Sequence, residues 1–414
     1  MTNCIHFPPL SSGNMKNFLA LFLGFLAGFS SFAFAQDCTP NWEVFSSEPY
    51  VEKAFPDTNV TYWRYRFEVP ENSTTGLKIS GKFPYSRYMN YNVYDQKTLD
   101  TAGSLPDREI LPEDGSKNPF LENADRKMVQ RDYSTWIVPS AYLSMPLPNI
   151  LPLPNGQYVE VWYRVYAPDK GKDKNGGVAL PTIKSIDLLT GEETACPKAK
   201  ALKTPPFLAF GSLPPGTNRD KIEFYRPKPG GFYPNKDNTY LVGFLSSDRK
   251  DVNVIQMRVP TFAKTDPGEP FFSDKNETRY WSLCSGGVSQ KTADCMRDFH
   301  FKQRKDGFIT AVVGPASIRE KVEARGLNFI NRGEFVFSVM IYRNLLAQEN
   351  FVGNQRKVPM LPAPELFNEK ERRRYAAQNY IGDYAPQGQS CSVETFLAEL
   401  EIGKSTLCNV PSGL

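Results

Sequence analysis

The sequence is poor in histidine. It contains two histidines in 414 residues, and only His300 lies beyond the N-terminal segment discussed below. Multi-histidine zinc and iron sites are therefore excluded, and a Ser-His-Asp triad would have to use this one imidazole. The alternation in Asp298-Phe299-His300-Phe301-Lys302 predicts a strand with a polar outer face and a buried pair of phenylalanines. A structural role for His300 is therefore favoured over a catalytic one.

Several functional signatures are also absent. The chain has no Gly-x-Ser-x-Gly elbow, phosphate-binding loop, dinucleotide fingerprint or calcium loop. Lys and Arg total 49 against 45 for Asp and Glu, and no basic stripe typical of nucleic-acid binders is present. The cysteines also lack the Cys-x-x-Cys spacing of a thiolate metal site. We therefore expect no cofactor, no metal and no nucleic-acid partner.

Long apolar runs are missing except near the N-terminus. Met15-Lys16-Asn17 precedes a run of Leu, Phe, Ala, Gly and Ser from Phe18 to Phe32, which ends in Ala33-Phe34-Ala35. This arrangement is typical of a secretory signal peptide, and the run is shorter than the roughly 20 residues that span a bilayer. We expect residues 1–35 to be a signal peptide, with Met15 as the true start and cleavage before Gln36. The mature chain would be exported to the periplasm or the extracellular space, without a transmembrane segment.

Six cysteines remain after removal of the leader: Cys38, Cys196, Cys284, Cys295, Cys391 and Cys408. An even number in an exported chain predicts disulfides, although the count alone allows many pairings. Their order favours two short loops, Cys284 with Cys295 and Cys391 with Cys408. Cys38 and Cys196 would then join the two ends of the first domain.

The length suits two domains rather than one core. Aromatic residues make up 13% of the chain, and short alternating segments recur between turn residues, as in antiparallel sandwiches. We expect a mostly β fold with two tandem antiparallel β-sandwich, jelly-roll-like domains at residues 36–200 and 226–364, joined by a linker at 201–225. A short helical, disulfide-fastened tail would follow at 365–414, with helices at Glu365–Gln378 and Ser392–Ile402, the second stopped at Gly403.

Four blocks of sequence recur in the same order, which predicts an internal duplication. The matched pairs are Gly81–Asp95 with Glu277–Cys284, Tyr133–Pro139 with Phe308–Pro315, Gly156–Arg164 with Gly333–Arg343, and Val178–Ile183 with Val358–Ala363.

The blocks of the first half resemble a bacterial envelope-associated domain of unknown function. The resemblance is carried by Arg87–Asp95, by the loop Asn149-Ile150-Leu151-Pro152-Leu153-Pro154 and by the strand Val161–Tyr166. That family has a strand ending in Tyr-Asp, an Asn-x-Leu-Pro-x-Pro loop and an Arg-x-Tyr strand in a jelly-roll-type sandwich. The second half keeps only part of the pattern, with Asn328-Phe329-Ile330 in place of the proline-rich loop. The resemblance implies a fold and no settled activity.

Arginines and tyrosines that recur within apolar strands are the most informative polar positions. A planar guanidinium can lock two strands through a carboxylate, or bind an anionic or sugar-like ligand beside aromatic rings. The candidate ligand-binding residues are Arg87, Tyr88, Trp162, Arg164, Arg279, Tyr280 and Arg343. The alternative is that the arginines form structural ion pairs and the tyrosines belong to the core.

The sequence therefore favours an exported, disulfide-bonded binding or structural protein, with a polysaccharide or another envelope component as its partner. The alternative is a hydrolase acting on such a polymer through paired carboxylates, with Asp95, Glu160 or Asp298 as acids. A third reading is a β-rich subunit of an extracellular assembly. No catalytic residue is assigned from the sequence.

Overall fold

The computed structural model describes residues 37–46, 54–154, 156–198, 221–228, 233–246, 248, 251–287, 291–335, 337–362 and 368–413. The chain from Gln36 to Leu414 forms one compact unit. The expected signal peptide and residues 201–220 of the expected linker lie outside the described residues. Within the described ranges, no helix is both long enough and apolar enough to cross a membrane.

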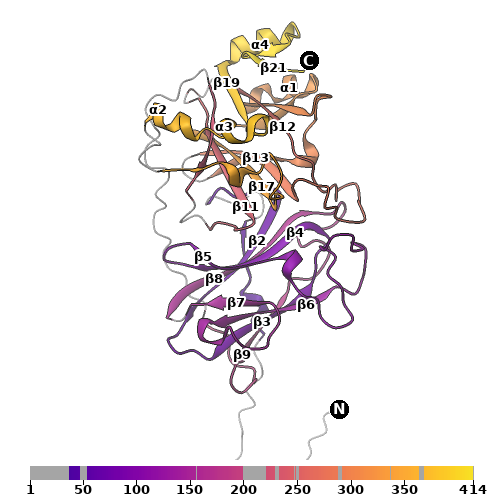
Figure 1. The fold of residues 1–414 in the computed structure, drawn as a ribbon, viewed down its shortest axis with the longest axis vertical. Coiled ribbons are helices and arrows are strands. Elements are labelled where there is room, and N and C mark those ends of the chain that lie inside the picture. Colours follow the sequence, from indigo (N-terminus) through magenta and orange to yellow (C-terminus); the bar gives the residue numbers. More distant parts are fainter. Residues whose placement is uncertain are drawn as a thin grey trace, which may run out of the picture. The chain divides into compact units, whose positions relative to one another are not determined.

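The first sandwich consists of two sheets packed face to face (Figure 1). One sheet has the order β1-β2-β8-β4-β5 and the other β7-β6-β3-β9. All pairs are antiparallel except β6 with β7. The strands are β1 (Glu43–Ser46), β2 (Val60–Val69), β3 (Thr75–Lys82), β4 (Ser86–Asp95), β5 (Thr101–Pro106), β6 (Asp132–Pro139), β7 (Ile150–Leu153), β8 (Gln157–Pro168) and β9 (Thr182–Asp187).

The second sandwich has sheets of order β14-β13-β17-β11-β10-β18 and β16-β15-β12-β19. Its strands are β10 (Phe224–Pro227), β11 (Asn238–Phe244), β12 (Asp251–Arg258), β13 (Tyr280–Gly287), β14 (Thr292–Arg297), β15 (Phe308–Gly314), β16 (Asn328–Asn331), β17 (Ser338–Leu345), β18 (Met360–Leu361) and β19 (Gln387–Ser392). The order β11-β17-β13-β14 matches β2-β8-β4-β5, and the parallel pair β15–β16 matches β6–β7. The expected fold class, mostly β with two tandem sandwiches and a short helical tail, is confirmed.

The C-terminal segment completes the second sandwich as well as forming helices. β19 pairs with β12 at the edge that β9 occupies on β3, whereas β18 pairs with β10 in the other sheet. Val358–Ala363 therefore does not take the place of Val178–Ile183, and this fourth repeat match is wrong. The sequence analysis did not predict β19, because its partner strand β12 lies more than 130 residues earlier in the chain.

The helices are short. The region expected as one helix at Glu365–Gln378 contains α2 (Glu369–Arg372), a 3-10 turn at Arg373–Tyr375 and the start of α3 (Gln378–Ile381). α4 (Val393–Glu401) agrees with the prediction, since the Ser392 side chain accepts a hydrogen bond from the Thr395 backbone N–H (3.1 Å) and Gly403 follows with a φ of 63°. A six-residue helix, α1 (Arg319–Ala324), packs beside β16, and β20 (Thr406–Leu407) pairs with β21 (Val410–Pro411).

All three predicted disulfides are present: Cys38–Cys196, Cys284–Cys295 and Cys391–Cys408. The first closes a loop of 158 residues and so ties the two ends of the first sandwich together. Three disulfides indicate that the chain folds in an oxidising, exported environment.

The central strands of the sheet β1-β2-β8-β4-β5 are buried on both faces. In β2, Trp63, Tyr65 and Phe67 point into the core of the first sandwich. Tyr62 points to the opposite face, where it belongs to a second apolar cluster with Tyr280 of the second sandwich. Because strands buried on both faces need not alternate apolar and polar residues, β4 and β8 are continuously buried and rich in aromatic residues.

Asp298–His300 form a 3-10 turn rather than the expected strand. The Asp298 carboxylate accepts hydrogen bonds from the backbone N–H groups of Trp281 (3.1 Å) and Phe299 (2.7 Å), and such side chain to backbone bonds favour a turn over a strand. Phe299 is consequently 42% exposed while Phe301 is buried, so the predicted buried phenylalanine pair is wrong.

Candidate binding cavity between the two sandwiches

Two equivalent arginines form ion pairs that cross between the sandwiches. Arg87 in β4 donates from Nη1 to Asp298 Oδ2 (2.9 Å) and from Nη2 to Asp266 Oδ2 (2.5 Å). Arg279, which directly precedes β13, lies 3.6 Å from Asp107 Oδ2. Asp107 and Asp298 each begin the 3-10 turn after β5 and β14. Each arginine therefore reaches the equivalent acid of the other sandwich, and these two candidates act as structural ion pairs.

Burial perturbs the acids of these pairs. Desolvation raises the pKa of Asp107 to about 7, because Arg279 at 3.6 Å offsets the burial only in part. Burial also raises the pKa of Asp298, with Arg87 acting in the opposite direction. Burial alone would raise the pKa of Asp266, but hydrogen bonding from Arg297 and the charge of Arg87 hold it below its ordinary value.

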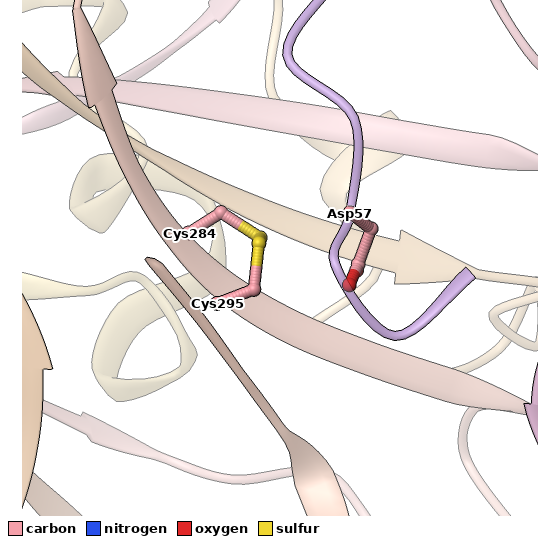
Figure 2. Close-up of side chains that lie close together, drawn as sticks. All are labelled: Asp57, Cys284 and Cys295. Atoms are coloured by element: carbon pink, nitrogen blue, oxygen red, sulfur yellow. A yellow bond between two sulfur atoms is a disulfide. The ribbon is translucent and has the colours of Figure 1, made fainter. Parts of the chain in front are cut away.

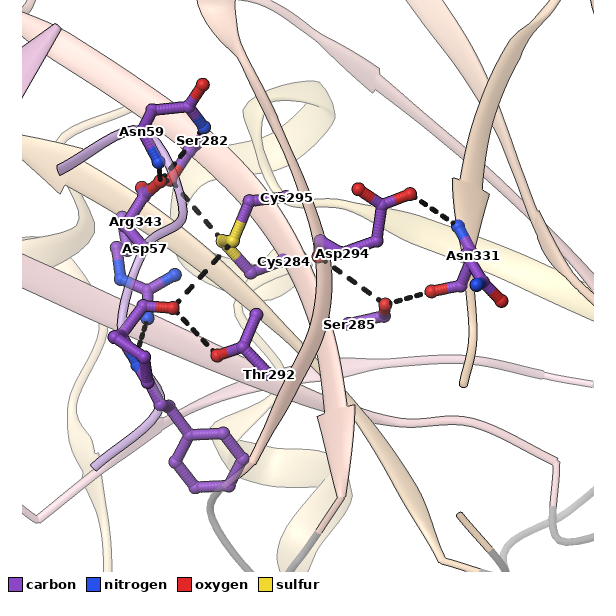
Figure 3. The surroundings of a disulfide bond; sticks show 12 residues. Asp57, Asn59, Ser282, Cys284, Ser285, Thr292, Asp294, Cys295, Asn331 and Arg343 are labelled. Carbon is purple, nitrogen blue, oxygen red and sulfur yellow. Dashed lines mark hydrogen bonds between the residues drawn. A yellow bond between two sulfur atoms is a disulfide. The ribbon is translucent and has the colours of Figure 1, made fainter. Parts of the chain in front are cut away.

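Two short segments are exchanged between the sandwiches. Phe55-Pro56-Asp57 and Tyr233-Pro234-Asn235 precede β2 and β11, and each contacts the sheet of the other sandwich; Figure 3 shows Asp57 beside β13. The exchanged hydrogen bonds are Ser282 to Asp57 (2.6 Å) and Thr292 to Pro56 (2.7 Å) on one side, and Asn90 to Asn235 (3.0 Å) and Thr101 to Pro234 (2.7 Å) on the other. The sandwiches are thus held by reciprocal contacts, as in a two-fold dimer.

The disulfide Cys284–Cys295 links β13 to β14 beside Asp57 (Figure 2). Both sulfurs and a carboxylate oxygen of Asp57 lie within 4.8 Å of one another. The sulfurs are bonded to each other, however, and the Asp57 carboxylate accepts hydrogen bonds from Tyr280 (2.8 Å) and Ser282 (2.6 Å). The group therefore serves as a crosslink next to the exchanged segment.

A cavity of about 700 Å³ lies between the two sandwiches. Its aromatic lining comes mainly from the first sandwich and the exchanged segments: Phe45, Phe55, Tyr62, Trp162, Tyr166, Tyr233 and Tyr240. Six of the described lining residues are basic and one, Asp100, is acidic; the basic ones are Arg164, Arg226, Lys228, Lys236, Arg343 and Arg356. The cavity therefore combines aromatic faces with an excess of positive charge.

Two arginines at the cavity rim, Arg226 and Arg356, donate to backbone oxygens. Arg226 donates to the carbonyls of Arg356 (2.9 Å) and Val358 (3.1 Å), and Arg356 donates to the carbonyl of Lys236 (3.0 Å). Burial and the neighbouring charge of Arg356 lower the pKa of Arg226. Carbonyl contacts leave the formal charges uncompensated, so this rim attracts anions.

Arg164 and Arg343 lie deeper in the cavity wall, where each is at least 96% buried. Arg164 donates from Nη1 to Asn92 and from Nη2 to the Tyr94 hydroxyl (2.6 Å). Arg343 donates from Nη2 to the Phe55 carbonyl, but its Nη1 has no hydrogen-bond partner among the described residues. Burial opposes the charge of Arg343, but Asp57 and nearby tyrosines raise its pKa, so the group stays protonated.

All seven candidate binding residues lie where the sandwiches meet. Trp162, Arg164 and Arg343 line the cavity. Arg87 and Arg279 form the crossing ion pairs, and the two tyrosines bridge the sandwiches, Tyr88 donating to Asp237 (2.6 Å) and Tyr280 to Asp57 (2.8 Å). Sequence reasoning missed the rim residues Arg226, Lys228, Lys236 and Arg356. The cluster Arg226-Pro227-Lys228 was the available signal, but it lay at the predicted edge of the linker.

The carboxylates proposed for catalysis do not form a pair. In the β4–β8 register, Tyr94 is opposite Glu160 and Asp95 is opposite Val159, so the two acids point to opposite faces of the sheet. Glu160 accepts hydrogen bonds from the Trp162 indole (2.7 Å) and the Tyr233 hydroxyl (3.2 Å). Asp95 accepts from the Lys97 backbone N–H in a turn (2.7 Å). Glycoside hydrolysis by two facing acids is not supported at these positions.

No family model and no curated protein match the chain. Among solved structures, an uncharacterized protein from Burkholderia cenocepacia is similar in fold, with 10% identity, a TM-score of 0.53, and coverage of 86% of this chain and 82% of that one. The VPA0106 protein from Vibrio parahaemolyticus also matches, with 12% identity, a TM-score of 0.42, and coverage of 71% and 86%. The first likeness concerns the β-rich fold alone.

Proposed function

We propose that the protein is an exported binding protein that holds an acidic ligand, such as a segment of an acidic envelope polysaccharide, in the cavity between its sandwiches. The observation that carries the proposal is the lining of this cavity, with six basic side chains against one acid. The three disulfides fit a periplasmic or extracellular location.

Two physical features favour an acidic, ring-containing ligand. The guanidinium groups of Arg226 and Arg356 donate to carbonyl oxygens in the described part of the chain, and such groups in a concave wall attract and orient carboxylates. The half-buried aromatic residues Phe45 and Tyr240 line the cavity and offer apolar ring surface to a sugar ring.

We further propose that the two sandwiches arose by duplication of one domain related to the envelope-associated family. Their matching strand orders and the reciprocal contacts of Arg87 and Arg279 support this origin. The equivalent residues Arg164 and Arg343, one from each sandwich, both line the cavity, so it lies where the two copies meet.

The proposal is tested with the mature protein from Gln36, polygalacturonate and neutral dextran, with binding and product release read in the same wells. We expect retention of polygalacturonate without release, and weaker binding as ionic strength rises. Arg226→Gln with Arg356→Gln should reduce this retention at least tenfold, whereas Arg319→Gln, a change at an exposed arginine outside the cavity lining, should not. Equal binding of both polymers, or release of product, would overturn the proposal.

A further inference from the structure

Two arginines share the rim of the cavity on the side of the second sandwich. Arg226 in β10 is half-buried, and Arg356 in the 3-10 turn Gln355–Lys357 is exposed. Burial lowers the pKa of Arg226, and the neighbouring positive charge of Arg356 lowers it further. Neither guanidinium contacts a carboxylate in the described part of the chain. The two side chains therefore concentrate positive charge at an accessible place.

Hydrogen bonds to the backbone hold both guanidinium groups in position. Arg226 donates from Nη1 to the carbonyls of Arg356 (2.9 Å) and Val358 (3.1 Å). Arg356 donates from Nη2 to the carbonyl of Lys236 (3.0 Å), and the Asn354 side chain accepts a hydrogen bond from the Arg356 backbone N–H (2.9 Å). Among the described residues, each arginine makes its side-chain bonds through one terminal nitrogen. The N–H groups of the other terminal nitrogen are therefore available to a ligand.

The basic rim belongs to one sandwich only. β1 and β10 occupy the same edge of the two equivalent sheets, since β1 pairs with β2 and β10 pairs with β11. Both strands border the cavity, but β1 contributes the ring of Phe45 and β10 contributes Arg226. Lys228, which follows β10, and Lys236, which follows the exchanged segment, are exposed and line the cavity as well. The cavity therefore gathers four cationic side chains near one edge and a half-buried ring at the equivalent edge.

We infer that Arg226 and Arg356 together bind a phosphate monoester carried by the sugar ligand, whose ring lies in the cavity. A phosphate monoester has a charge of roughly −1.5 to −2 near pH 7 and three acceptor oxygens, so it can accept hydrogen bonds from both guanidinium groups at once. A carboxylate offers one charge and would neutralise the pair only in part. The inference rests on the proposed function and adds to it the acidic group of the ligand, a sugar phosphate.

The test compares three acidic forms of one sugar, galactose 6-phosphate, galactose 6-sulfate and galacturonate, by calorimetry on the mature protein from Gln36. The sulfate matches the phosphate in shape but carries one charge. Wild type should bind the phosphate about tenfold more tightly than the sulfate or the carboxylate at pH ~7.5. Because the second pKa of a phosphate monoester is about 6, this preference should disappear at pH ~5. The sulfate keeps its charge and so controls for titration of the protein.

The variant Arg356→Gln removes one half of the pair. Arg356 is exposed and its side chain bonds to one carbonyl, so this variant should fold, which circular dichroism checks. It should lose about tenfold in affinity for galactose 6-phosphate and bind the sulfate almost unchanged. The matched control is Lys357→Gln, which removes an exposed positive charge from the same turn at a residue outside the cavity lining. The control should keep the wild-type preference.

The outcomes separate this inference from the proposed function. If wild type binds neither polygalacturonate nor any of the three sugars, the proposed function itself fails. If polygalacturonate binds but the phosphate is not preferred, or if Lys357→Gln loses as much as Arg356→Gln, the phosphate site is refuted and the proposed function stands. Sedimentation with phosphatidylcholine vesicles that contain phosphatidic acid, without binding of galactose 6-phosphate, would assign the phosphate to a lipid and overturn the sugar phosphate.

Discussion

The crossing ion pair between Arg87 and Asp298 offers the sharpest test of how the sandwiches are joined. Both side chains are 0% exposed, and the substitution Asp298→Asn leaves the guanidinium paired only with Asp266. Removing one partner of a buried ion pair costs about 3–5 kcal/mol. Because Asp266 still neutralises part of the charge at 2.5 Å, we expect the lower end, a fall of about 3 kcal/mol in the free energy of unfolding.

An exposed ion pair of even shorter distance is the matched control. Lys82 Nζ lies 2.6 Å from Asp132 Oδ1, but the side chains are 51% and 39% exposed. Solvent screening limits such pairs to about 0–1 kcal/mol, so Asp132→Asn should hardly change stability. Urea unfolding followed by circular dichroism and tryptophan fluorescence measures both variants. Equal losses for Asp298→Asn and Asp132→Asn would refute the argument that burial makes the crossing pair important.

Three further predictions follow from the same contacts. Because burial raises the pKa of Asp107 to about 7, protonated Asp107 stabilises the folded state fully below pH ~4, and this contribution is lost as the pH rises through 7. The free energy of unfolding of Asp107→Asn relative to wild type should therefore increase between pH 4 and 8 in urea titrations. A difference that does not change with pH would contradict this. Cys38→Ser with Cys196→Ser opens a loop of 158 residues and should cost about 2–5 kcal/mol in urea unfolding, whereas an unchanged midpoint would show that the crosslink is dispensable. The double variant Asn92→Cys, Ser104→Cys should form a disulfide that mass spectrometry detects. Asn92 in β4 pairs with Ser104 in β5 just as Cys284 in β13 pairs with Cys295 in β14. Two free thiols would disprove the equivalence of these strand pairs.

The features predicted correctly from the sequence depend on short-range or compositional signals. The disulfide pairing followed from cysteine order, and the start of α4 followed from Ser392 as a helix cap. The sandwich fold followed from short strands between turn residues. The strand expected around His300 failed because Asp298 bonds to two backbone N–H groups, one of them from β13, a contact that local alternation does not reveal.

The candidate site was predicted only in part. The recurring arginines marked the sheets that meet between the sandwiches, since a basic residue in a strand buried on both faces needs a partner. Whether that partner is a carboxylate, as for Arg87, or a backbone carbonyl of the exchanged segment, as for Arg343 and Phe55, depends on long-range contacts. The rim residue Arg226 could not be found this way, because its place in the cavity is set by long-range pairing of β10 with β11 and β18.

The two sandwiches share the residues that join them but differ at many other register positions. The shared arginine–aspartate pairs and the proline-containing segments hold the sheets together by reciprocal bonds. The sheets differ beside the cavity, where Asn92, Tyr94 and Trp162 correspond to Cys284, Gly286 and Ile341, and also on their opposite faces, where Tyr91 and Val93 correspond to Leu283 and Ser285. A joint built from matching contacts therefore brings together two sheets of unlike composition. The cavity between them has two chemically different walls, which fits a ligand with two unlike ends better than a symmetric one.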